Sequence, residues 1–170
     1  MREGTDGLVW FNGLPREDAE RELRACCAAR AWACAVAAGR PYPDADALSA
    51  AASAALAELT WPDIAEALEA HPRIGEKTTG GGRDAAWSRR EQAAVTEADT
   101  GVRDALADAN REYEQRFGHV FLVFANGRAP DELLAAARAR LGHDPATEQD
   151  VVRAELARIV QLRLHRLVAG

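Results

Sequence analysis

The chain has 170 residues, a formal net charge of −6, and 48% hydrophobic against 28% charged residues, which excludes a disordered chain and a basic nucleic-acid binder. It contains 38 alanines, 20 arginines and one lysine, all good helix formers, but only two tyrosines and four phenylalanines for strands. We therefore predict an all-α, single-domain helical bundle over residues 1–170, of about seven or eight helices, with residues 1–10 as a flexible tail.

The first half of the chain predicts three helical regions followed by a loop. Proline and acidic residues at the start of each region, and glycine or proline at its end, place these helices at residues 15–39, 44–59 and 60–71. The third helix ends at His71, because Pro72 disfavours helical geometry in the residue before it. Gly80-Gly81-Gly82 then indicates a loop, which we interpret as a linker.

The second half predicts one long helical region, a short extended segment and two further helices. Ser88 begins the long region, and Gly118 ends it. Residues 120–125 include the one strongly apolar, β-prone run, and the turn signal Asn126-Gly127 follows it. The expected helices are 88–117, with a break near Gly101, then 130–142 and 147–168.

The cysteines and histidines predict no metal or redox site. Cys26, Cys27 and Cys34 lie in one helical region without CxxC spacing, and the four histidines show no metal-ligand pattern. We read the cysteines as small buried apolar residues. An odd cysteine count without a signal sequence predicts a cytoplasmic protein, and no apolar run approaches the ~20 residues that span a bilayer.

The segment from His71 to Lys77 is the first candidate site, because it combines reactive side chains with an unusual backbone at Pro72. A histidine at a helix end, followed by proline, has a defined direction and titrates near neutral pH, as a general acid or base must. It is equally compatible with a helix C-terminal residue whose cationic form suits the helix dipole. Lys77, the only lysine, is a candidate Schiff-base amine, a role that needs a desolvated site.

The sequence from Trp87 to Gln92 is the second candidate. Ser88 and Glu91 match the S-x-x-E capping box, which is a sufficient structural explanation for both. A helix N-terminus also attracts anions, so the same place suits a carboxylate substrate. Gln92 is not needed by a capping box and is therefore the surplus polar residue.

Arg163 is the third candidate, since it falls between apolar neighbours on the last predicted helix. Most arginines on helices are solvated or extend an apolar stem along the surface. A partly buried arginine needs an anionic partner, which here is either Glu91 or a substrate.

These places, in this order, resemble the OHCU decarboxylase family, where OHCU is 2-oxo-4-hydroxy-4-carboxy-5-ureidoimidazoline. The resemblance covers about residues 11–168 and is carried by four short pieces of sequence. They are His71-Pro72-Arg73-Ile74-Gly75, Ser88-x-x-Glu91-Gln92, Tyr113-x-x-Arg116-Phe117-Gly118 and Leu162-Arg163-Leu164.

The resemblance implies an all-α, homodimeric enzyme without cofactors that converts this small-molecule intermediate of urate breakdown to (S)-allantoin. By similarity His71 is the catalytic acid or base, and Glu91 and Arg163 complete the active site. The residues implied in substrate binding are Pro72, Ser88, Gln92, Phe121, Leu122, Val123, Phe124 and Ala125, the last five through their main chain.

The proposed chemistry accounts for the lack of any cofactor motif. A decarboxylase must accept the electrons of the breaking C–C bond, which usually requires a cofactor or a Schiff base. In this substrate the carboxylate sits on a carbon next to a ring C=N, so the imine accepts the electrons itself. The alternative is a non-catalytic helical binding or scaffold module, in which Ser88 and Glu91 only cap a helix and Arg163 is a surface charge.

Overall fold

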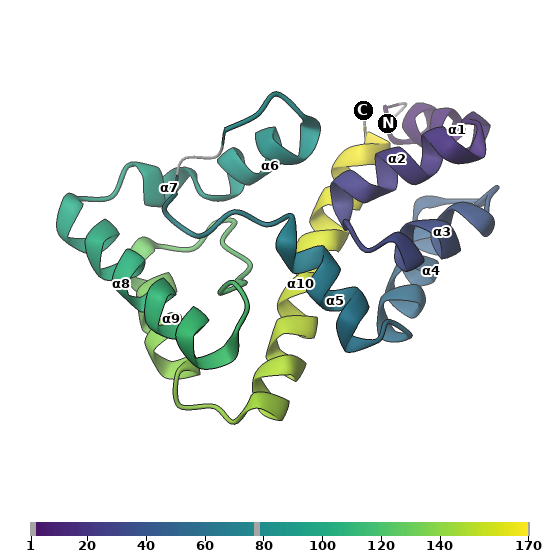
Figure 1. Cartoon of the computed structure of the whole chain (residues 1–170). Coiled ribbons are helices and arrows are strands. Elements are labelled where there is room, and N and C mark those ends of the chain that lie inside the picture. The colour runs from purple at the N-terminus through teal and green to yellow at the C-terminus, as the bar shows by residue number, and fades with distance from the viewer. Residues whose placement is uncertain (1–2, 77–78, 170) are drawn as a thin grey trace. The chain divides into compact units, whose positions relative to one another are not determined.

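The computed structural model describes residues 3–76 and 79–169, and every regular element in this part of the chain is a helix (Figure 1). The all-α prediction is therefore confirmed, with ten helices among the described residues where about seven or eight were expected. In order they are α1 (Glu3–Gly13), α2 (Arg16–Cys26), α3 (Arg30–Ala38), α4 (Ala45–Ala57), α5 (Trp61–Glu69), α6 (Arg83–Glu91), α7 (Ala93–Thr96), α8 (Thr100–Phe117), α9 (Pro130–Arg140) and α10 (Pro145–Ala169).

The chain forms two compact units. The first contains Met1–Ala67 and Ala157–Gly170, and the second contains Leu68–Leu156. Helix α10 therefore contributes its beginning to the second unit and its end to the first. That the two units together make a single domain stays a prediction.

In the first unit, α3 packs against both α2 and α4. Trp32 of α3 is fully buried, and its indole N–H donates to the carbonyl of Ala52 in α4 at 3.0 Å, so the largest core side chain has its polar atom satisfied. Asp44 caps α4, since its carboxylate accepts the N–H of Ala47 at 2.7 Å.

Within the described chain, the predicted tail over 1–10 is wrong from Glu3 onward, because helix α1 runs from Glu3 to Gly13. Leu8 and Phe11 of this helix are buried. The guanidinium of Arg40 donates to the carbonyls of Phe11 and Leu14, both at 2.8 Å, which satisfies acceptors at the end of α1. The weak amphipathic pattern of this segment hid the helix, and a contact from 26 or more residues away completes it.

The predicted helix over 15–39 is two helices, separated at residues 27–29. Cys27 has extended backbone angles, and α3 restarts at Arg30. The carboxylate of Glu66 accepts both the backbone N–H of Arg30 at 3.1 Å and its side-chain Nε–H at 3.2 Å. A side chain from a distant helix therefore caps α3, and no local signal marks this break.

In the second unit, α8 packs against α9 around a core of buried apolar side chains. Gly118 ends α8 in the left-handed conformation with φ of 78°, as predicted, and its N–H donates to the carbonyl of Glu114 at 2.8 Å. The core residues are Ile74, Val95, Leu106, Ala109, Tyr113, Phe121, Val123, Ala125, Leu133, Leu134 and Ala137.

The predicted helix over 88–117 is also wrong in its boundaries. Ser88 lies inside α6, which begins at Arg83, so Ser88 and Glu91 are not a capping box. The chain then forms the short α7 before α8 starts at Thr100, where the carboxylate of Asp99 accepts the N–H of Val102 at 3.0 Å. Asp99 thus provides the cap that the sequence reading assigned to Ser88.

Two of the three cysteines match the prediction. Cys26 and Cys27 are buried, and burial raises the pKa of the Cys27 thiol to about 11, so this thiol is protonated and unreactive at neutral pH. Cys34 is exposed, contrary to the prediction, and its sulfur accepts from the Arg16 guanidinium at 3.2 Å. Among the described residues, no helix has the length and apolar character needed to cross a membrane.

Candidate functional site

His71 lies just after the end of α5, in the second unit. Helix α5 ends at Glu69, and the His71 N–H donates to the carbonyl of Leu68 at 3.0 Å, so the helix stops close to where Pro72 predicted. Both His71 and Pro72 are partly exposed. An imidazole held at a helix end and partly open to its surroundings has the access that a proton-transfer group requires.

The loop that follows His71 is held by side chains from two other helices. The side-chain oxygen of Gln92 accepts the N–H of Gly75 at 3.1 Å, and the amide of Asn110 donates to the carbonyl of Ile74 at 2.9 Å. Gly75 has φ of 90°, a conformation that a side chain would strain. The His71 loop therefore has a defined position relative to the end of α6 and to α8.

Arg73, also in this loop, makes a two-point ion pair with Glu114 of α8. Its Nε and Nη2 donate to the two carboxylate oxygens at 2.5 and 3.1 Å. The pairing accounts for Arg73 as a structural residue, since it fixes the loop to α8 without involving the imidazole of His71.

Ser88, Glu91 and Gln92 lie in the last turn of α6 and at its end. Ser88 and Gln92 are buried at 4% and 8% exposure, and Glu91 is partly exposed. Ser88 and Glu91 are three residues apart and share one face of the helix. Gln92 links this turn to the His71 loop through Gly75, so the structure brings two of the three predicted pieces into one local arrangement.

Residues 120–125 form neither helix nor strand, and Phe121, Leu122, Val123 and Ala125 are buried. Two main-chain groups of this segment are bonded to charged side chains. Arg140 donates to the carbonyl of Leu122 at 2.7 Å, and the carboxylate of Glu155 accepts the N–H of Phe124 at 2.7 Å. Between them, the N–H and C=O of Val123 make no hydrogen bond within the part of the chain that the structure describes.

A buried ionic network contacts this segment through Arg140, and the sequence did not predict it. Glu148 is fully buried and accepts from Arg140 Nε at 2.7 Å, from the Tyr113 hydroxyl at 2.5 Å and from His143 Nδ1 at 2.9 Å. Burial acts to raise the pKa of Glu148, but the hydrogen bonds from Arg140, Tyr113 and His143 outweigh it and hold the pKa below its usual value. Burial, with the bond to Glu148, raises the pKa of Tyr113.

The network also explains the Tyr113-x-x-Arg116-Phe117-Gly118 piece as structural. Tyr113 binds Glu148, Arg116 donates to the carbonyl of His143 at 2.7 Å, and Phe117 lies 4.7 Å from the Tyr113 ring. In the sequence, Glu148 is only the second residue of the helix expected over 147–168. Its burial depends on Tyr113, 35 residues away, which no local pattern reveals.

Arg163 lies in the first unit, on α10, and is buried at 4% exposure. Its Nη1 donates to the carbonyl of Ala25 in the last turn of α2 at 3.2 Å. The interpretation of Arg163 as a solvated surface charge is therefore wrong. A buried guanidinium at the carbonyl end of a helix gains from the helix dipole.

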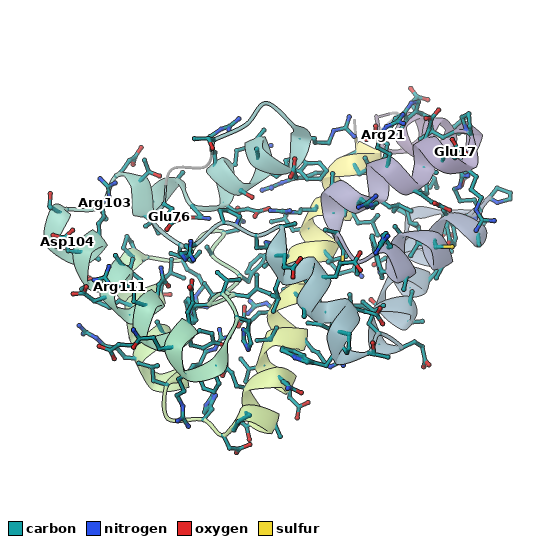
Figure 2. All side chains as sticks on the ribbon, viewed as in Figure 1. Glu17, Arg21, Glu76, Arg103, Asp104 and Arg111 are labelled. Carbon is teal, nitrogen blue, oxygen red and sulfur yellow. The ribbon has the colours of Figure 1, made fainter. Side chains whose placement is uncertain are left out.

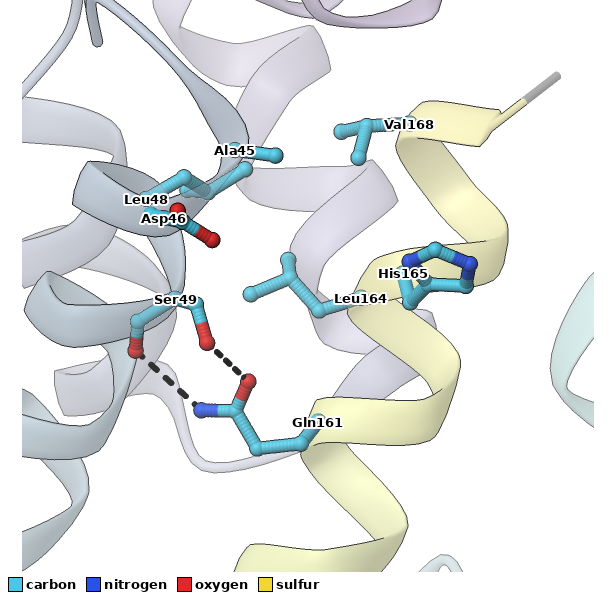
Figure 3. A pocket seen from close by; sticks show the side chains of 8 residues that line it. All are labelled: Ala45, Asp46, Leu48, Ser49, Gln161, Leu164, His165 and Val168. Carbon is cyan, nitrogen blue, oxygen red and sulfur yellow. Dashed lines mark hydrogen bonds between the residues drawn. The ribbon is translucent and has the colours of Figure 1, made fainter. Parts of the chain in front are cut away.

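Two surface cavities lie in the described part of the chain, one in each unit. In the first unit, a pocket of about 200 Å³ lies between α4 and α10, where Gln161 bonds both the hydroxyl and the carbonyl of Ser49 (Figure 3). In the second unit, a cleft of about 350 Å³ lies between the 73–76 loop and α8, near the labelled Glu76, Arg103 and Arg111 (Figure 2). Neither His71, Glu91 nor Arg163 lines either cavity.

Lys77, the candidate amine, lies outside the described residues. Within the described ranges, no cluster of three histidine, cysteine, aspartate or glutamate side chains could hold a metal ion.

Comparison with known proteins places this arrangement in a family. A family model described as OHCU decarboxylase matches residues 12–165. The chain is 30% identical over 138 residues to the 2-oxo-4-hydroxy-4-carboxy-5-ureidoimidazoline decarboxylase of Amia calva, covering 80% of this chain and 79% of that protein. It is 27% identical over 158 residues to the uric acid degradation bifunctional protein TTL of Arabidopsis thaliana, covering 91% of this chain but about half, 48%, of the plant protein.

Solved structures show the same fold. A crystal structure of an OHCU decarboxylase in the presence of (S)-allantoin has a TM-score of 0.77 at 24% identity and covers 88% of this chain and 98% of that one. A crystal structure of (S)-allantoin synthase has a TM-score of 0.70 at 17% identity, covering 94% of this chain and 53% of that one. The family-model match over residues 12–165 and the identity to the Amia calva enzyme show that the chain belongs to the OHCU decarboxylase family.

Proposed function

We propose that the protein is a carboxy-lyase that converts 2-oxo-4-hydroxy-4-carboxy-5-ureidoimidazoline to (S)-allantoin in urate degradation. The observation that carries this proposal is the family match over residues 12–165, which includes all the predicted site residues. The names of the Amia calva and Haloferax volcanii relatives, the latter 28% identical over 125 residues, support the same substrate.

The reaction balances without an added oxidant or reductant. The bond between the ring carbon and its carboxylate breaks, carbon dioxide leaves, and the electron pair moves into the neighbouring C=N. The imine nitrogen takes up a proton, the hydroxyl on the decarboxylated carbon loses its proton and becomes a carbonyl, and the neighbouring ureido-bearing carbon takes up a proton on one face, which gives allantoin. The protein must orient the ring, stabilise the developing charge and deliver the proton to one face.

The proposed roles follow from the chemistry of each group. His71 relays the proton, Glu91 orients the imidazole or the substrate hydroxyl, and Arg163 binds the ring oxygen or the developing charge with its forked donors. We prefer this contact to one with the departing carboxylate, because holding the carboxylate would stabilise the ground state.

The hydrogen bonds within the protein indicate which polar groups are left to bind the substrate. Gln92 uses its side-chain oxygen on Gly75, so we propose that its NH₂ group donates to the substrate. Pro72 and Ser88 complete this side of the proposed site. On the segment Phe121 to Ala125, Val123 has an unpartnered N–H and C=O within the described chain, a donor and acceptor pair that matches the N–H and C=O edge of a cyclic amide.

The oligomeric state of the protein, its location in the cell and its cofactor requirement also belong to this proposal. The resemblance supports a homodimer, and the cysteine composition supports a cytoplasmic location. We propose that the reaction uses no cofactor, because the imine of the substrate accepts the electrons.

The test is to add the protein and a hydroxyisourate hydrolase to freshly oxidised urate and to follow optical activity. We expect rapid formation of dextrorotatory (S)-allantoin, while a reaction without the protein gives the racemate slowly. Racemic allantoin at the uncatalysed rate would contradict the proposed function and would favour the helical scaffold alternative. Heat-inactivated protein serves as the control for buffer effects.

A further inference from the structure

The main chain of residues 121–125 is positioned by two charged side chains from different helices. Arg140, near the end of α9, binds the carbonyl of Leu122, and Glu155, on α10, binds the N–H of Phe124. Both bonds measure 2.7 Å, and both involve a charged partner, which makes them shorter and stronger than neutral hydrogen bonds. The segment has no strand neighbour in the described chain, so these bonds replace the ladder that would otherwise fix it.

Arg140 is itself held rigidly. It is 5% exposed, and its Nε and Nη2 donate to one carboxylate oxygen of Glu148 at 2.7 and 2.5 Å, which leaves Nη1 for Leu122. The guanidinium carbon lies 4.6 Å from the centre of the Phe121 ring, within cation–π range. One side chain therefore fixes both a side chain and a carbonyl of the same segment.

Glu155 acts from the other side of Val123. Its side chain is partly exposed, so its removal opens no core cavity, unlike that of Arg140. Val123 is buried at 4% exposure and lies between the two bonded residues, while its own N–H and C=O have no partner in the described chain. A buried peptide group without partners is costly, and a bound ring that supplies them would recover that cost.

We infer that Arg140 and Glu155 are positioning residues for the proposed decarboxylation. By fixing the main chain on both sides of Val123, they hold its N–H and C=O in the orientation that binds the substrate ring. Ring orientation decides which face of the carbanion receives the proton, so these residues control the enantiomer formed as well as the affinity. The inference rests on the proposed function.

The Glu155 arm of the test uses two variants and a matched control. In Glu155→Ala we expect KM to rise roughly tenfold and the fraction of (S)-allantoin to fall, because Phe124 loses its acceptor. Glu155→Gln keeps a side-chain oxygen for the N–H and should recover most of the wild-type KM and enantiomer ratio. Asp150→Ala, at an exposed acidic residue of the same helix, should behave as wild type.

The Arg140 arm tests the same point from the opposite side. Arg140→Lys keeps the charge beside Glu148 but loses the fork that reaches Leu122, so we expect a higher KM and a lower enantiomer ratio. Thermal unfolding of every variant separates positioning from stability. If Arg140→Lys fails to fold, the Glu155 variants still decide the question.

The outcomes separate this inference from the proposed function. If wild-type protein forms (S)-allantoin but Glu155→Ala matches Asp150→Ala in KM and enantiomer ratio, the positioning role is overturned and the function stands. A loss of Tm in Glu155→Ala without any change in KM or enantiomer ratio would also overturn it. Inactive wild-type protein would overturn both.

Discussion

Two buried arginines depart from the expectation that the many arginines of this chain are exposed. Most of the 20 arginines follow from composition, yet Arg140 and Arg163 are buried at 5% and 4% exposure. Arg140 meets a buried carboxylate, while Arg163 meets a helix-end carbonyl at Ala25. An ion pair stabilises the first guanidinium, and the carbonyl end of a helix stabilises the second.

The first residue-scale prediction concerns His71 and Glu91. His71→Asn and Glu91→Ala should each lower kcat by ~10²–10⁴-fold, because each removes a group proposed to act in proton transfer. Both side chains are partly exposed, so Tm should change little. His165→Asn, at an exposed histidine of α10, is the matched control and should keep wild-type kcat. Wild-type rates in both site variants would contradict the assigned roles.

The second residue-scale prediction concerns acid stability. The hydrogen bonds to Glu148 hold its pKa in the folded protein below the ordinary value of 4.5, so the unfolded chain binds this proton more readily. The stabilisation is present at neutral pH and should be lost as the pH falls below about 4.5. Urea unfolding between about pH 5 and about pH 3 should show a smaller loss of unfolding free energy in Glu148→Gln than in wild type. Equal slopes would exclude Glu148 as a source of the pH dependence.

At the scale of elements, helix ends are decided by different kinds of contact. The start of α4 is capped by the local side chain of Asp44, at the residue where the sequence placed the beginning of this helix. The start of α3 is capped by Glu66 from another helix, and the predicted helix ran straight through it. Local caps are readable because the chain itself supplies the partner, whereas distant caps appear only once the tertiary contact forms.

Gly118 gives the element-scale prediction. Its φ of 78° closes α8, and an added methyl group would meet no atom within 4 Å, so only backbone strain opposes a side chain there. Gly118→Ala should lower the free energy of unfolding by about 1–2 kcal/mol in urea titrations. Gly13→Ala is the control, because Gly13 also has open space but no positive φ, and it should be neutral or stabilising. Similar values for both variants would rule out the strain argument.

At the scale of the whole molecule, the sequence predicted the all-α class and the family, because both depend on composition and on short local pieces. It missed α1, the division of 15–39 and the Arg140 and Glu148 network, each of which depends on a contact between distant residues or on a weak local pattern. For the site, it selected His71, Glu91 and Arg163, but it misread Ser88 as a cap. That His71, Glu91 and Arg163 act together in one active site stays a prediction.

The whole-molecule prediction is the oligomeric state. If the resemblance holds for assembly, sedimentation velocity at micromolar concentration should give a mass about twice the 18.3 kDa of one chain. The value should persist on dilution through the range used for enzyme assays. A single species at the mass of one chain would contradict the homodimer and would place the complete active site in one subunit.

The buried ion pair also has a consequence for the order of folding. Arg140 and Glu148 are only eight residues apart, so closing the loop between them costs little chain entropy. Tyr113 reaches the same carboxylate from 35 residues away and can join only at a larger entropic cost. The α9–α10 turn should therefore be an early local nucleus, with α8 and residues 121–125 docking onto a guanidinium that is already in place.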